Sequence, residues 1–65
     1  MRLKPQTLEL EMASRAMEYR QLARKAGITE TTLRAARNGE EIRNATAGKI
    51  AAALGVRVDQ IMEKR

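Results

Sequence analysis

The chain has 65 residues, of which 13 are Lys or Arg and 8 are Asp or Glu, giving a formal net charge of +5. This length fits one small domain, and the basic charge favours a polyanionic partner such as nucleic acid. The sequence contains no Cys, His, Phe or Trp. Their absence removes disulfides, the commonest metal ligand, the usual general base and aromatic platforms for single strands. We therefore expect neither an enzyme nor a cofactor or metal site.

Neither end of the chain is expected to form a helix or a membrane segment. Residues 1–4 form a short basic arm with Arg2 and Lys4, and residues 63–65 are expected to fray. No apolar run approaches the roughly 18 residues of a membrane span, and charge comes too early for a signal peptide. We expect residues 1–65 to form a single cytoplasmic domain with no membrane association and no small-molecule ligand.

A first helix is predicted from Pro5, which suits the first helical position, to about Ala16. Glu9 falls inside the apolar arc of this helix, so its carboxylate needs a partner or a route to water. At about 100° per residue, the apolar side chains cover one broad arc that should face the core, made of Leu8, Leu10, Met12, Ala13, Ala16 and Met17.

The central stretch, residues 19–39, predicts two short helices over about 18–25 and 30–37, joined by a tight turn. Gly27 suits the left-handed conformation that ends a helix, and Ile28 packs beneath the turn. Thr29 is a good N-cap, since its hydroxyl accepts from a free N–H of the next helix. The inward-facing residues are Leu22, Ala23, Ala26, Leu33 and Ala36. A helix pair of this length is a helix-turn-helix unit.

The remainder predicts two further helices. Asn38 and Gly39 end the second helix of the pair, and Asn44 is a plausible N-cap for a fourth helix that Gly55 stops. A short fifth helix starts near Asp59. The expected core residues here are Ala47, Ile50, Ala51, Leu54, Val56, Val58, Ile61 and Met62. The fold class is therefore all-α, a compact five-helix bundle.

Two segments carry a family resemblance, QLARKAGITETTLRAARNG at residues 21–39 and KIAAALGVRVDQIM at residues 49–62. The chain resembles the phage-repressor and Cro (Xre-type) helix-turn-helix domain from about Leu8 to Met62. This resemblance implies a lambda-repressor-like fold that binds double-stranded DNA with the helix over residues 30–37 in the major groove.

The resemblance also implies the base-contacting side chains. Arg34 has the fork geometry for guanine O6 and N7, and Glu30 can accept from cytosine N4 or simply serve as a helix-start acid. Ala35 stands where many relatives have a longer polar residue, which leaves a thymine methyl contact. The full groove-facing set is Thr29, Glu30, Thr31, Arg34 and Ala35.

Phosphate contacts are expected from the start of the second helix, where N–H groups and the helix dipole favour an anion, and from the loop after the third helix. Tyr19 has an equal rival role as core filler with its hydroxyl at the surface. The expected phosphate-contacting residues are Tyr19, Arg20, Gln21, Asn38, Gly39 and Arg43.

One ion pair is also suggested by the resemblance. Family members often carry an acid two residues before the closing glycine, paired with an arginine on the first helix. Here Arg37 occupies the acid's position and Met12 aligns with the arginine. We predict that the pair is kept with its charges exchanged, so that Arg37 meets Glu9 or, failing that, Glu11. The alternative places Arg37 in solvent or on a phosphate.

The leading functional hypothesis is a transcriptional regulator, most simply a phage or mobile-element repressor. It would act as a homodimer on half-sites about one helical turn apart. By resemblance, the dimer surface would use the loop before the fourth helix or the fifth helix. The second hypothesis keeps the fold but gives it a protein partner, as in an antitoxin or antirepressor partner. Glu30 and Ala35 on the groove-facing helix favour this alternative slightly.

Overall fold

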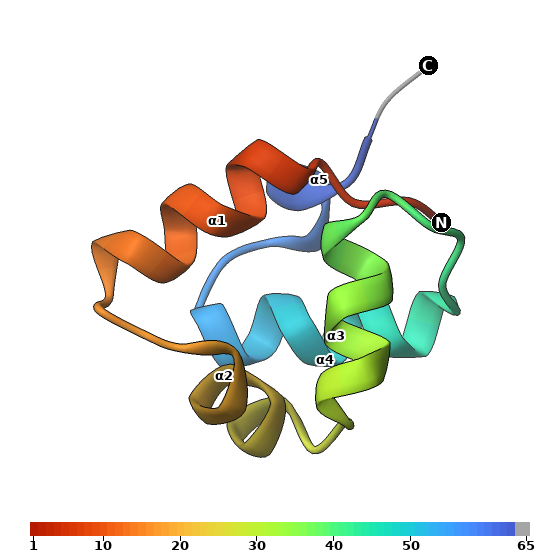
Figure 1. The fold of residues 1–65 in the computed structure, drawn as a ribbon. Helices are drawn as coiled ribbons and strands as arrows, with labels where there is room; N and C mark the ends of the chain where they lie inside the picture. The colour runs from red at the N-terminus through yellow and green to blue at the C-terminus, as the bar shows by residue number, and fades with distance from the viewer. Residues whose placement is uncertain (64–65) are drawn as a thin grey trace.

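The computed structural model describes residues 1–63, which fold into five α-helices (Figure 1). These are α1 (Pro5–Ser14), α2 (Tyr19–Ala26), α3 (Glu30–Arg37), α4 (Asn44–Leu54) and α5 (Val58–Ile61). Helix α4 packs against α2 and α5, while α3 packs against α1 and α2. The prediction of an all-α, five-helix domain is confirmed.

The turn between α2 and α3 has the predicted construction. Gly27 has a φ of 74°, a left-handed conformation that an L side chain adopts only at a cost. The N–H of Ile28 donates to the carbonyl of Ala23 at 2.9 Å, which folds the chain back under α2. Thr29 Oγ1 accepts from the N–H of Thr32 at 3.1 Å and so caps α3. These local hydrogen bonds fix the direction of α3 relative to α2.

Helix α1 is shorter than predicted. It ends at Ser14 instead of about Ala16, and Ala16 has a φ of 52°. The N–H of Met17 then donates to the carbonyl of Met12 at 2.9 Å, which closes the helix end. The prediction was wrong here because the left-handed position holds alanine, so no glycine marks the end of the helix.

We expect Ala16→Gly to stabilise the domain by about 0.5–1 kcal/mol. A residue with a Cβ atom in the left-handed conformation costs about 1–2 kcal/mol, and glycine removes this cost. Part of the gain is lost because glycine also increases the conformational entropy of the unfolded chain. Urea denaturation followed by circular dichroism measures the change. The matched control is Ala13→Gly, an exposed position inside α1, which should destabilise by about 0.5–1 kcal/mol. Equal effects of both variants would contradict the assignment.

The core contains leucine and isoleucine side chains spaced by alanines. Leu10, which was predicted to face it, is instead 67% exposed, and Ala13 and Ala16 are also exposed. The predicted arc spans about 200° of the α1 surface, but only Leu8 and Met12 are buried, and Met17, beyond the end of α1, packs half-buried against the core. The buried residues are Leu3, Leu8, Met12, Leu22, Ala23, Leu33, Ala36, Ala47, Ile50, Ala51, Ala53, Leu54 and Ile61.

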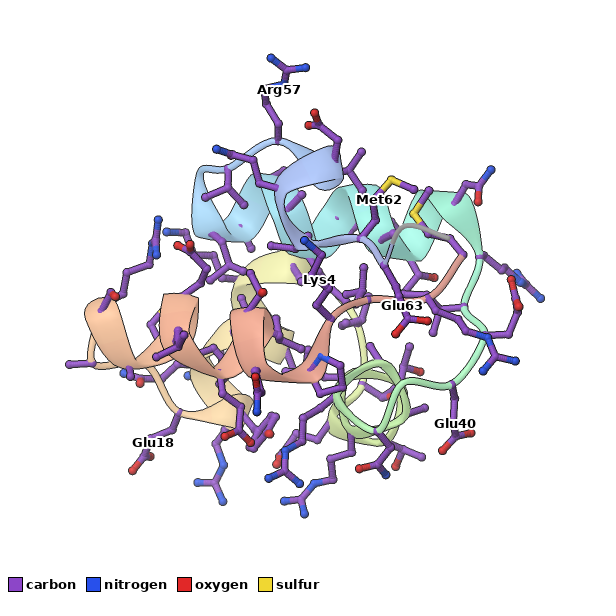
Figure 2. The ribbon with its side chains drawn as sticks, turned by 90° about the horizontal axis from the view of Figure 1, so that it is seen from above. Lys4, Glu18, Glu40, Arg57, Met62 and Glu63 are labelled. Carbon is purple, nitrogen blue, oxygen red and sulfur yellow. The ribbon has the colours of Figure 1, made fainter. Side chains whose placement is uncertain are left out.

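The N-terminal residues lie along the end of the described chain. Leu3 is fully buried and forms an isolated antiparallel bridge with Met62. The N–H of Lys4 donates to the carbonyl of Ile61 at 2.8 Å, and the N–H of Glu63 donates to that of Arg2 at 2.7 Å. Figure 2 shows Lys4, Met62 and Glu63 in this region. Residues 64 and 65 of the predicted frayed tail lie outside the described residues.

Helices α4 and α5 follow the prediction with one correction. Asn44 is the first residue of α4, and Arg43 holds the cap position, so Asn44 is not the N-cap. Gly55 has a φ of 71° and ends α4 as expected, and Asp59 lies in the first turn of α5. Of the five helices described, none is long and apolar enough to cross a bilayer.

Candidate DNA-binding surface

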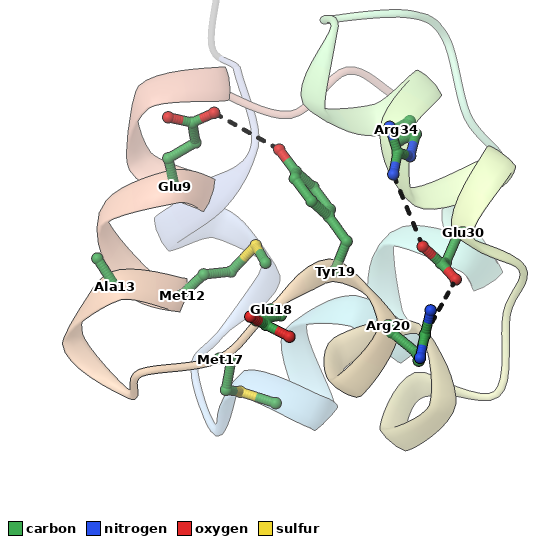
Figure 3. A pocket seen from close by; sticks show the side chains of 9 residues that line it. All are labelled: Glu9, Met12, Ala13, Met17, Glu18, Tyr19, Arg20, Glu30 and Arg34. Carbon is green, nitrogen blue, oxygen red and sulfur yellow. Dashed lines mark hydrogen bonds and ion pairs between the residues drawn. The ribbon is translucent and has the colours of Figure 1, made fainter.

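The first turns of α2 and α3 border one open hollow of about 560 Å³, and α1 forms its other side (Figure 3). The hollow combines apolar side chains from α1 with charged and aromatic side chains from α2 and α3. The residues that line it include Glu9, Met12, Tyr19, Arg20, Glu30 and Arg34. The fold thus brings part of the predicted phosphate set beside part of the predicted base-reading set.

The five predicted base-reading residues differ in how available their side chains are. Thr31 and Arg34 are exposed, and the Arg34 side chain retains 63% of its accessible surface. Thr29 is exposed, but its hydroxyl already caps α3. Ala35 is half-buried, and its carbonyl accepts from the N–H of Glu40 at 3.0 Å. Thr31 and Arg34 are therefore the most accessible polar side chains of the set.

Glu30 lies between two arginines from two different helices. One carboxylate oxygen is 3.9 Å from Arg20 Nε on α2, and the other is 3.7 Å from Arg34 Nη2 on α3 (Figure 3). The Glu30–Arg34 pair has the i, i+4 spacing of neighbours on one helix face, so the sequence contained a signal for it. The pairing with Arg20 depends on how α2 and α3 pack, and no local pattern predicts it.

Tyr19 has features of both roles considered for it. Its side chain is half-buried and packs against the core, while its hydroxyl donates to Glu9 Oε1 at 3.5 Å. The guanidinium carbons of Arg34 and Arg37 lie 5.5 and 6.0 Å from the ring centroid, within cation–π range. Burial raises the pKa of the Tyr19 phenol; the Arg37 charge opposes this rise and the Glu9 carboxylate adds to it. The phenol therefore stays protonated and acts as a platform for two arginines.

Arg37 and Glu9 form an ion pair that links α3 to α1, with Arg37 Nε donating to Glu9 Oε1. The hydrogen bond and the charge of Glu9 raise the pKa of the Arg37 guanidinium. Both side chains keep about half their accessible surface, 46% for Arg37 and 48% for Glu9. Glu9 thus has both the partner and the route to water that its place in the apolar arc required. Glu11 pairs with Arg15 instead.

We expect a double-mutant cycle on Glu9→Gln and Arg37→Met to give a small favourable coupling energy. An ion pair this exposed is screened by water, so the coupling should exceed the error of the measurement without dominating stability. Urea denaturation of the wild type, both single variants and the double variant measures it. As a control, Glu11→Gln combined with Arg37→Met should be additive. A Glu9–Arg37 coupling indistinguishable from zero would contradict a stabilising role for the pair.

The remaining predicted phosphate residues form two groups. Arg20 and Gln21 are exposed on the first turn of α2, and the Gln21 Oε1 atom accepts from the N–H of Glu18 at 2.8 Å. Asn38, Gly39 and Arg43 lie after the other end of α3, near the N-terminus. The two groups therefore flank α3 from its two ends.

The loop after α3 is held by contacts that sequence reasoning missed. The N-terminal ammonium pairs with Glu41 and lowers the pKa of that carboxyl group. The guanidinium of Arg2 donates to the carbonyl of Gly39 at 3.4 Å, and the N–H of Ile42 donates to that of Met1 at 2.8 Å. These contacts join residues about 40 positions apart, so no spacing in the sequence predicts them.

Of three comparisons with known proteins, one gave a match. Searches of curated proteins and of solved structures found no match. The profile of the Cro/C1-type HTH DNA-binding domain, however, matches residues 7–64. That range includes the whole of α2, α3, α4 and α5 and most of α1. The chain therefore belongs to the family of Cro/C1-type helix-turn-helix DNA-binding domains, and DNA is its partner.

Proposed function

We propose that this domain is a sequence-specific transcriptional regulator, most simply a repressor of phage or mobile-element type, acting on DNA in the cytoplasm. Helix α3 enters the major groove, and Thr31 and Arg34 contact base edges. Thr29 lies next to the DNA because it caps the first turn of α3. Ala35 contacts a thymine methyl group. Glu30, the fifth groove-facing residue, lies between Arg20 and Arg34.

One observation carries this proposal, the meeting of the first turns of α2 and α3 on one face. Arg20 from α2 and Arg34 from α3 share the carboxylate of Glu30, at 3.9 and 3.7 Å. If Arg34 on α3 enters the major groove, Arg20 on α2 must lie close to the edge of that groove. The phosphates line this edge, so Arg20 can contact them. Tyr19, Arg20 and Gln21 then contact one phosphate strand, and Asn38, Gly39 and Arg43 contact the strand beyond the other end of α3.

The regulator acts as a homodimer on two related half-sites. A single eight-residue helix reaches only a few base pairs, and two copies about one helical turn apart double the site that is read. Val58 and Met62 are half-buried at or beside α5, so they offer apolar surface to a second copy.

The test is selection from a random duplex library, followed by affinity measurements on the enriched sequences at several salt concentrations. An enriched motif with two related half-sites is the expected result. Binding to that motif should exceed binding to unrelated duplexes by about 10³-fold or more, and both should weaken as salt rises. Binding without any enriched motif would overturn the proposal.

The alternative, a protein-interaction module on the same fold, is favoured by one feature. Three guanidinium groups near the hollow, from Arg20, Arg34 and Arg37, are each paired with a carboxylate. Part of the positive charge that would attract phosphates is therefore neutralised within the protein. Selection with no enrichment, together with weak and wholly salt-sensitive binding, is the result that this alternative predicts.

A further inference from the structure

The carboxylate of Glu30 forms the centre of a three-residue cluster, Arg20–Glu30–Arg34, which we call the Glu30 cluster (Figure 3). The cluster joins α2 to α3 at the point where both helices begin. Its outer members are well exposed, at 76% for Arg20 and 63% for Arg34, whereas Glu30 is 42% exposed between them.

The Glu30 cluster is poorly suited to stabilising the fold. Its two ion-pair distances are close to 4 Å, and exposed pairs of this kind contribute little to the free energy of unfolding. Glu30 is not needed as a cap either, because the Thr29 hydroxyl already accepts from the N–H of Thr32. As an acid in the first turn of α3, Glu30 favours the helix dipole, but this role needs neither arginine.

Glu30 is also poorly placed to read a cytosine. Each of its two carboxylate oxygens faces a different guanidinium, Oε2 toward Arg20 and Oε1 toward Arg34. A base that donates to Glu30 would therefore have to share an oxygen that already faces a guanidinium. The arginines are attractive to DNA because of their charge, so the carboxylate and the DNA compete for the same two groups.

We propose that Glu30 is a positioning residue that sets sequence specificity by holding Arg20 and Arg34 and competing with phosphates for both guanidinium groups. On unrelated DNA, the carboxylate repels the nearby phosphates and lowers non-specific affinity. On the operator, Arg34 exchanges its loose contact with Glu30 for two hydrogen bonds to a guanine. Arg20 stays beside Glu30 through its Nε atom and contacts the phosphate strand with its terminal N–H groups. The ring of Tyr19 also supports Arg34, with its centroid 5.5 Å from the guanidinium carbon.

This inference rests on the proposed sequence-specific function, and its test uses the full chain with Glu30→Gln. Glutamine keeps the size of the side chain and removes its charge. The matched control is Glu63→Gln, which removes one negative charge from a carboxylate outside the cluster. Both variants and the wild type are first compared by circular dichroism, and then titrated with an unrelated duplex and with the selected duplex at several salt concentrations.

We expect Glu30→Gln to strengthen binding to the unrelated duplex by about two- to fivefold relative to Glu63→Gln. Its plot of log affinity against log salt should be steeper by about 1, as if one more phosphate were neutralised. On the selected duplex, discrimination should fall by roughly three- to tenfold at the base pair that Arg34→Ala also affects.

Two outcomes would overturn the proposal. If Glu30→Gln changes the preference at a base pair that Arg34→Ala leaves unchanged, Glu30 reads that base itself. If Glu30→Gln and Glu63→Gln behave alike on both duplexes, the cluster has no role in specificity. Failure of the proposed function would look different from both outcomes, because the wild type would then show no enriched motif. The salt slopes on the unrelated duplex would still test whether Glu30 competes with phosphates for the two arginines.

Discussion

Leu33→Ala should lower the free energy of unfolding by about 2–5 kcal/mol, enough to populate the unfolded state at room temperature. Leu33 is fully buried in α3, where that helix packs against α1 and α2. Five of the thirteen buried residues are alanines, Ala23, Ala36, Ala47, Ala51 and Ala53, so each large buried side chain supplies a sizeable share of the core. A domain this small lies near the low end of the roughly 5–15 kcal/mol that folded domains possess.

The matched control is Leu10→Ala, the same chemical change at a leucine that is 67% exposed. Its effect should lie within about 0.5 kcal/mol of zero, because no packed neighbours lose a contact. Urea denaturation followed by circular dichroism compares both variants with the wild type. Similar midpoints for Leu33→Ala and Leu10→Ala would contradict the core described here.

Arg34→Ala should remove about 1–3 kcal/mol of discrimination, roughly 5- to 150-fold, at a single base pair of the selected site. Its guanidinium projects from the exposed side of α3 and stacks over Tyr19, so its fork is partly oriented before DNA arrives. The other base pairs of the site should keep their ranking. Affinities for a panel of single-base-pair substitutions in the selected duplex measure this pattern.

Arg57→Ala controls for the loss of one positive charge. Arg57 is 81% exposed and pairs with Asp59 at the start of α5, and it lies on the side of the molecule opposite α3 (Figure 2). Its replacement should weaken binding to all sequences slightly and equally. If Arg34→Ala also weakens binding uniformly, Arg34 contacts phosphate instead of a base.

Local signals in the sequence predicted the helix-turn-helix unit well. Gly27 and Thr29 act within four residues of their own position, through a left-handed conformation and a cap. The leucines at 22 and 33 are buried as predicted, because each lies on a short helix with one narrow apolar stripe. Features of this kind depend little on the remainder of the fold.

Features that depend on distant packing could not be predicted in the same way. Leu10 was expected in the core but is exposed, whereas Leu3, in the segment expected to be a basic arm, is buried and pairs with Met62 just after α5. The Glu9–Arg37 pair was suggested by the family resemblance and by no spacing in the sequence. The contact between Arg20 and Glu30 depends on the angle at which α2 meets α3, and only the folded structure shows it.

The bridge between Leu3 and Met62 affects the order in which the chain folds. It closes a loop of nearly the whole described chain, and the entropy lost on closure increases with loop length. Helices α2 and α3, by contrast, are neighbours in sequence and can pack early. The backbone amides of Lys4 and Glu63 should therefore exchange with deuterated solvent through local opening, while those inside α4 wait for the whole domain to unfold. Fraying then begins where the two ends meet and leaves the DNA-binding helices intact.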